Sequence, residues 1–125
     1  SDFDGSKRLI CAPVIAMDCL SDGKCSRELP AEIGAPAFMR IDFAKKVVVG
    51  QKRTTPIMHS DKSDQQLVLQ GVEMGLAWTI VIDTTDGAMM VSMVDSAGAY
   101  VLSGSCTPAI PAIFVQAAAS VVISR

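Results

Sequence analysis

Cysteine is the residue type with the clearest chemical potential in this sequence, because four of them form an even set in a short chain. Cys19 and Cys25 bracket the polar segment Leu-Ser-Asp-Gly-Lys, whose Asp-Gly pair favours a tight turn that a disulfide could close. That pairing leaves Cys11 with Cys106, a bond that ties the first predicted strand to the last. A zinc site would need closely spaced pairs of the Cys-x2-Cys kind, which the sequence lacks. We therefore expect two disulfides and an oxidising compartment.

Acid–base and nucleophilic chemistry has little support in the sequence. His59 is the sole histidine, so a mechanism that pairs a nucleophile with a histidine base must use it. It is not accompanied by a Gly-x-Ser-x-Gly elbow, a P-loop or a His-Glu-x-x-His motif. Asp83 and Asp86 are spaced like calcium ligands, but the rest of a calcium-binding loop is missing, so we interpret them as turn residues. The sequence favours a protein that is not an enzyme and predicts no cofactor and no metal ion.

Methionine is the other residue type that could bind something. Of the seven methionines, Met89 and Met93 lie on the same face of one predicted strand. Their flexible thioethers could line a cavity for an apolar ligand, or they could fill irregular core space. Together with the Met58-His59 pair they could also hold Cu(I), because soft ligands select that ion. We favour the core and cavity interpretations over the copper site.

The elements that position these residues belong to one domain. The chain has 125 residues, a formal net charge of -2 and a hydrophobic share of 50%, which excludes disorder for most of its length. A pI of about 5.2 and the lack of like-charge runs give no support to binding of nucleic acid or of an anionic membrane. We expect a single β domain over residues 1–108, followed by an apolar tail over residues 109–125.

Short apolar and β-branched runs separated by turn residues predict an all-β, antiparallel domain. In the clearest hairpin, Asp86-Gly87 supplies the residues that tolerate positive φ. Successive strands are expected to be neighbours in a meander, and a bond between the first and last predicts a small barrel or a strongly curled sheet, either filled or hollow. The eight predicted strands are Leu9–Met17, Ala37–Phe43, Lys46–Val49, Thr55–His59, Leu67–Val72, Ala77–Asp83, Ala88–Val94 and Tyr100–Ser105.

Two segments lie outside this strand pattern. Residues 18–36 contain prolines and glycines and predict a disulfide-pinned loop with at most one helical turn near Pro30. In the tail, apolar residues at helical spacing predict a helix from about Pro111, while Val121-Val122-Ile123 would fit a final strand. The tail is shorter than the roughly 20 residues of a membrane helix. We expect it to dock on the domain or to form a homodimer through residues 109–125.

A family resemblance is carried by motifs spread over residues 3–108. They are Phe3-Asp4-Gly5-Ser6-Lys7, Leu9-Ile10-Cys11-Ala12, the Asp18-Cys19 to Cys25 loop, Met39-Arg40-Ile41-Asp42-Phe43, Arg53-Thr54-Thr55-Pro56-Ile57, Leu67-Val68-Leu69-Gln70-Gly71-Val72-Glu73, Ala77-Trp78 and Gly104-Ser105-Cys106-Thr107-Pro108. Together they resemble a group of small exported proteobacterial β-rich proteins of unknown function. The resemblance implies a signal peptide upstream that is removed, and a periplasmic or secreted location. It brings no catalytic residue with it.

Two functions are compatible with these observations. The first is an exported, non-enzymatic β module that binds a small apolar ligand or a protein partner. The second is a small periplasmic enzyme or enzyme inhibitor that uses a polar sheet face, with candidates Arg40, Asp42, Arg53, Glu73 and His59. The residues that we single out as a ligand or surface site are Arg40, Asp42, Trp78, Met89 and Met93.

Overall fold

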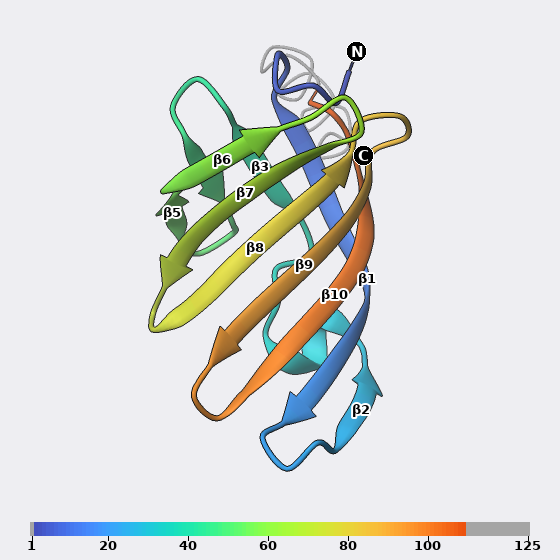
Figure 1. Ribbon diagram of the computed structural model, residues 1–125, viewed down its shortest axis with the longest axis vertical. Helices are drawn as coiled ribbons and strands as arrows, with labels where there is room; N and C mark the ends of the chain where they lie inside the picture. Colours follow the sequence, from blue (N-terminus) through green and yellow to red (C-terminus); the bar gives the residue numbers. More distant parts are fainter. Residues whose placement is uncertain (1, 110–125) are drawn as a thin grey trace, which may run out of the picture.

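The computed structural model describes residues 2–109, which form an all-β domain built on one curled antiparallel sheet, as the strand pattern predicts (Figure 1). The predicted tail helix, the alternative final strand and the docking of the tail lie outside the described residues. The strands are β1 (Leu9–Leu20), β2 (Cys25–Glu28), β3 (Met39–Asp42), β4 (Val47–Val49), β5 (Thr54–Pro56), β6 (His59–Lys62), β7 (Gln66–Glu73), β8 (Leu76–Asp83), β9 (Ala88–Asp95) and β10 (Gly98–Pro108), with a 3-10 helix, η1 (Pro30–Ile33), after β2.

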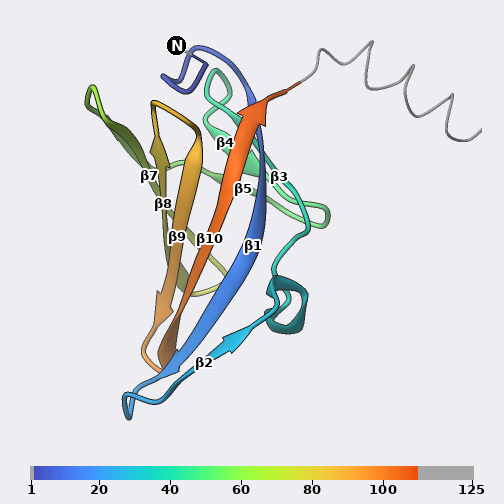
Figure 2. The same ribbon diagram turned by 90° about the vertical axis from the view of Figure 1, so that its right-hand side faces the viewer.

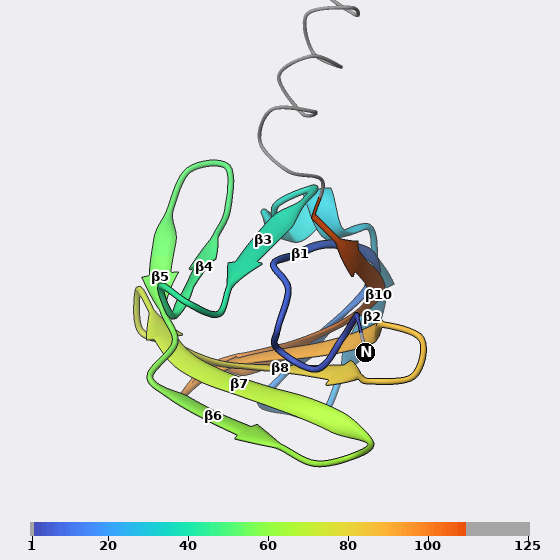
Figure 3. The same ribbon diagram turned by 90° about the horizontal axis from the view of Figure 1, so that it is seen from above.

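The order of the strands explains why the sheet curls. They follow the order β5-β4-β3-β1-β10-β9-β8-β7-β6, and β2 pairs with β1 beside this path. Because β5 and β6 are consecutive in the chain but stand at the two ends of the order, those ends must lie close together (Figure 3). The Ile57 N–H donates to the Lys46 carbonyl and the Met58 N–H to the Gln70 carbonyl, both at 2.8 Å, as the chain crosses. The result is a half-barrel with a concave inner face and a convex outer face.

The predicted strands need two corrections. The expected strand Thr55–His59 is divided, because the chain leaves one end of the sheet after β5 and joins the other end at β6. The expected loop over residues 18–36 contains the end of β1 and all of β2, which pair as a hairpin. The single helical turn predicted near Pro30 is η1. The meander is confirmed for β7 to β10.

Two disulfides fasten β1 to its neighbours. Cys11–Cys106 joins two directly paired residues of β1 and β10, and Cys19–Cys25 joins two directly paired residues of β1 and β2. These are the pairs that the cysteine spacing favours. The β1–β10 ladder runs the length of the molecule, with a bulge at the exposed Val14 (Figure 2).

The core lies on the concave face and fills one end of the half-barrel. Its largest fully buried side chains are Leu9, Cys11, Ile41, Leu69, Ile82 and Met89. The segment before β1 closes this end: the ring of Phe3 lies so close to Gly87 that a Cβ there would stand 2.6 Å from Cζ of the ring. The convex face carries exposed apolar side chains among its polar ones: Val72, Met90 and Val94 are 51%, 50% and 44% exposed. Within residues 2–109 no helix has the length and apolar character needed to cross a membrane.

Candidate functional site

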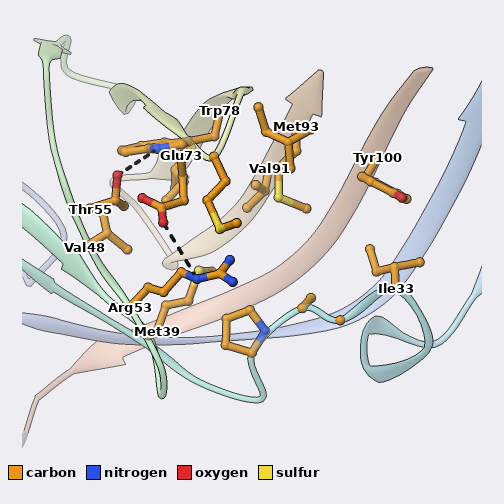
Figure 4. Close-up of a pocket in the computed structure, with 17 residues that line it drawn as sticks. Ile33, Met39, Val48, Arg53, Thr55, Glu73, Trp78, Val91, Met93 and Tyr100 are labelled. Atoms are coloured by element: carbon orange, nitrogen blue, oxygen red, sulfur yellow. Dashed lines mark hydrogen bonds and ion pairs between the residues drawn. The ribbon is translucent and has the colours of Figure 1, made fainter. Parts of the chain in front are cut away.

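A cavity of about 300 Å³ opens on the concave face, in the part of the half-barrel that the N-terminal segment does not fill (Figure 4). One wall comes from β7 to β10, and the other from the residues after η1, from β3 and from the β4–β5 hairpin. Most of its lining side chains are apolar, with Ile33, Met39, Val48, Ile80, Val91 and Met93 among them. Its volume is at the lower end of the range of about 300–1,000 Å³ for small-molecule pockets.

One cross-strand row builds the first wall. Gly71 of β7 pairs with Trp78 of β8, Trp78 with Met93 of β9, and Met93 with Tyr100 of β10. Residues directly opposite each other in antiparallel strands point to the same face, so this register brings the indole, the thioether and the phenol side by side. The short β7–β8 and β9–β10 turns fix the register.

Trp78 reaches across β7 because its partner in the row is a glycine. A Cβ on Gly71 would stand 2.6 Å from Cε2 of the indole and 2.8 Å from the Pro56 carbonyl oxygen. The indole Nε1–H donates a long hydrogen bond of 3.4 Å to Thr55 Oγ1, and that hydroxyl donates to the Val72 carbonyl at the same distance. Trp78 therefore spans the gap between β7 and β5, where the two ends of the sheet meet.

The mouth of the cavity carries one pair of opposite charges. Arg53 stands in the β4–β5 turn and Glu73 at the end of β7, with Arg53 Nε 4.0 Å from Glu73 Oε1. The side chain of Arg53 is 59% exposed and that of Glu73 is 30% exposed. Because Arg53 is largely in water, this contact contributes little to stability.

A strained turn stands beside this pair. Met74 and Gly75 are the two residues between β7 and β8, with φ of 50° and 83°. Two consecutive positive φ values are typical of a type I′ hairpin, which prefers Asn-Gly or Gly-Gly. Met74 is nevertheless a methionine, 72% exposed, and it lines the cavity. Backbone strain of this kind gathers at functional sites.

The structure separates the residues that the sequence singled out. Trp78 and Met93 line the cavity. Met89 faces the same side but is 1% exposed and lies with its sulfur 3.9 Å from Cys106 Sγ, so it belongs to the core. Arg40 is exposed on β3 beside the buried Ile41, which faces inward. Asp42 shares the orientation of Arg40, and its carboxylate accepts the Lys45 N–H at 2.9 Å.

The structure brings together only part of the predicted polar sheet face. Arg53 and Glu73 were candidates for a polar sheet face, and they meet at the cavity, whereas Arg40, Asp42 and His59 do not line it. Thr55 and Tyr100 also line the cavity, and the sequence pattern does not single them out. Gly71 inside an apolar strand was the available signal, because an isolated glycine in a strand marks a close approach of another group.

Metal-binding and family comparisons add no further assignment. Residues 2–109 contain no group of three or more His, Cys, Asp or Glu side chains arranged to hold a metal ion. The chain matches no protein-family model, no curated protein and no solved structure.

Proposed function

We propose that this protein is a non-enzymatic module that binds a small apolar ligand in the concave cavity. The observation that carries the proposal is the wall formed by Trp78, Met93 and Tyr100 around a space of about 300 Å³. Aromatic side chains offer a large apolar surface for contact. The flexible thioether of methionine adapts its shape to the ligand. Few polar groups face the cavity, as is usual for sites that recognise an apolar body and orient it by one polar end.

We further propose that the protein is exported to the periplasm or secreted, after removal of a signal peptide, as a member of the proteobacterial group that its motifs resemble. All four cysteines are paired in disulfides, which is compatible with an oxidising compartment. A small enzyme or enzyme inhibitor has less support, because its candidate residues Arg40, Asp42 and His59 share no cavity with Arg53 and Glu73.

The test is native mass spectrometry of the protein purified from an exporting host, recorded before and after gentle denaturation. We expect a small molecule to leave on denaturation, and all four cysteines to resist alkylation without reductant. Replacement of Met93 by Asp, which puts a charge into the wall of the cavity, should abolish the bound mass. The matched control Met90→Asp changes the adjacent outward-facing part of β9 and should retain it. A wild-type protein that carries no such mass, and binds none when apolar compounds are supplied, would contradict the proposal.

A further inference from the structure

The charges at the mouth of the cavity distinguish between classes of ligand. Among the described residues that line the cavity, Arg53 and Glu73 are the only ones whose side chains carry a formal charge at neutral pH. The two groups form an ion pair, but their 4.0 Å separation is longer than a hydrogen bond. A polar ligand group at the mouth would meet both of them.

The guanidinium of Arg53 has unused donors. It approaches Glu73 through Nε, and within residues 2–109 no hydrogen bond engages its two terminal nitrogens. In Figure 4 these two nitrogens lie beyond Nε and point away from the Glu73 carboxylate. A guanidinium presents its N–H groups as a planar fork that fits the two oxygens of a carboxylate.

The surrounding charge favours an anion over a cation. The β4–β5 turn carries Lys52 beside Arg53 and has no acidic residue, while the end of β7 contributes Glu73. Among the described residues, Arg53 is the only cation that lines the cavity, and Lys52 adds a weaker, solvent-screened positive charge from the same turn. A cationic ligand that approached Glu73 would have to pass the exposed guanidinium that already faces this carboxylate.

The size of the cavity limits the rest of the ligand. A volume of about 300 Å³ equals that of about ten water molecules at about 30 Å³ each. We propose, resting on the function proposed above, that the ligand is a medium-chain carboxylate. Its head group binds the Arg53 fork, and its chain lies along Trp78, Met93 and Tyr100.

The single tryptophan makes this proposal testable, because Trp78 forms part of the cavity wall and its fluorescence reports on that site alone. The probes are ω-bromodecanoate, ω-bromodecanol and ω-bromodecylammonium, whose binding displaces water from around the indole and changes the emission of Trp78. At pH 8 and below the micelle concentrations, we expect the carboxylate to bind at least tenfold more tightly than the alcohol. In Arg53→Gln this preference should fall to less than threefold.

The neighbouring cation provides a matched control. Lys52→Gln removes the same charge from the same turn, but Lys52 does not line the cavity, so the preference should stay within threefold of wild type. Equal binding of carboxylate and alcohol by the wild type would overturn the inference and leave the apolar pocket standing. Preferential binding of the ammonium probe would also overturn it, in favour of Glu73. Binding of none of the three probes would contradict the proposed function itself.

Discussion

Gly71 is the position at which one added methyl group has the clearest consequence. An alanine Cβ would overlap both the indole of Trp78 and the Pro56 carbonyl, and the carbonyl belongs to the backbone and cannot swing away. We expect Gly71→Ala to lower the free energy of unfolding by about 2–3 kcal/mol, the upper range for overpacking. The fluorescence of Trp78 should shift to longer wavelength as its contact with Thr55 is lost. Urea unfolding followed by that fluorescence measures both effects.

Gly50→Ala serves as the control for this prediction. Gly50 lines the cavity, and the nearest atom to an added Cβ is the Arg53 carbonyl oxygen at 3.5 Å, an ordinary contact. Its free energy of unfolding should change by less than about 0.5 kcal/mol. If the two variants behaved alike, the close packing of Trp78 over β7 would not be the cause.

Met74 occupies a turn position whose positive φ disfavours methionine. Asparagine tolerates a φ near 50° far better than methionine, and Asn-Gly is the preferred type I′ pair. We expect Met74→Asn to raise the free energy of unfolding by about 1 kcal/mol and to weaken binding of ω-bromodecanoate two- to threefold. Met58→Asn, at an exposed methionine with negative φ outside the cavity, should change neither quantity. A variant at Met74 that is both less stable and equally good at binding would refute this interpretation.

Residue patterns predicted part of the site and missed the rest for a physical reason. Trp78 and Met93 stand out by type, and both line the cavity. By alternation along β9, Met89 points to the same face as Met93. However, Met89 pairs with Ile82 and lies beside the Cys11–Cys106 bond, which places it in the filled end of the half-barrel. The meeting of Arg53 with Glu73 depends on how far the sheet curls, which the period of a single strand does not encode.

Among the elements, β1 and β10 depend most on a covalent link. Cys11–Cys106 closes a loop with a sequence separation of 95 residues and is buried, whereas Cys19–Cys25 closes one of 6 and lies at the exposed end of β1. In the chain-entropy model, loss of the first bond costs about 4–5 kcal/mol and loss of the second about 2 kcal/mol. Paired Cys→Ala variants, compared by urea denaturation, test this ranking. A larger loss on removal of Cys19–Cys25 would contradict it.

The segment before β1 should respond to acid. Hydrogen bonds from Ser6, first from its hydroxyl and then from its backbone N–H, lower the pKa of Asp4 from 3.8 to about 2. Because the folded pKa is the lower one, the stabilisation is complete well above pH 3.8 and disappears as the pH falls through about 2. The melting temperature of wild type should therefore exceed that of Asp4→Asn at pH 6, and the two should converge towards pH 2. A difference that persists at pH 2 would show that the charge of Asp4 is not responsible.

Strand patterns predicted the long elements and missed the short polar ones. β7 to β10 alternate or run apolar because they cover the core, so their sequences carry the signal. β2 and β6 contain only exposed or half-buried side chains, and they are strands because β1 and β7 offer them backbone partners. Such strands are determined by their neighbours, and a pattern in one segment does not reveal them.

At the scale of the whole molecule, the curl of the sheet joins fold to site. Of the two predicted alternatives, a barrel or a curled sheet, the structure has the curled sheet. The chain crosses directly from β5 to β6, and Trp78 bridges the same gap, but no ladder of hydrogen bonds joins the two end strands. Of the predicted alternatives for the interior, filled or hollow, each applies to one end of the half-barrel. Phe3 and the buried core fill one end, and the row from Trp78 to Tyr100 borders a cavity in the other.

The apolar tail supplies the last prediction, on assembly. Residues 110–125 carry no charge before Arg125, whereas the core and both disulfides lie within residues 2–109 and the Ala109 N–H donates to the Arg8 carbonyl at 2.8 Å. A chain that ends at Ala109 should therefore fold, with a melting temperature within about 3 °C of the full chain. We propose that the tail forms the homodimer contact, so sedimentation velocity should give a dimer for the full chain and a monomer for the shortened one.

A charge placed in the tail separates this contact from a loss of chain length. Ala118→Glu keeps the full length of the chain but puts an unpaired carboxylate into the apolar segment, so it should also give a monomer. A shortened chain that remains a dimer would move the contact to the convex face, where Val72, Met90 and Val94 are exposed. A full chain that is monomeric at all concentrations would remove the homodimer altogether.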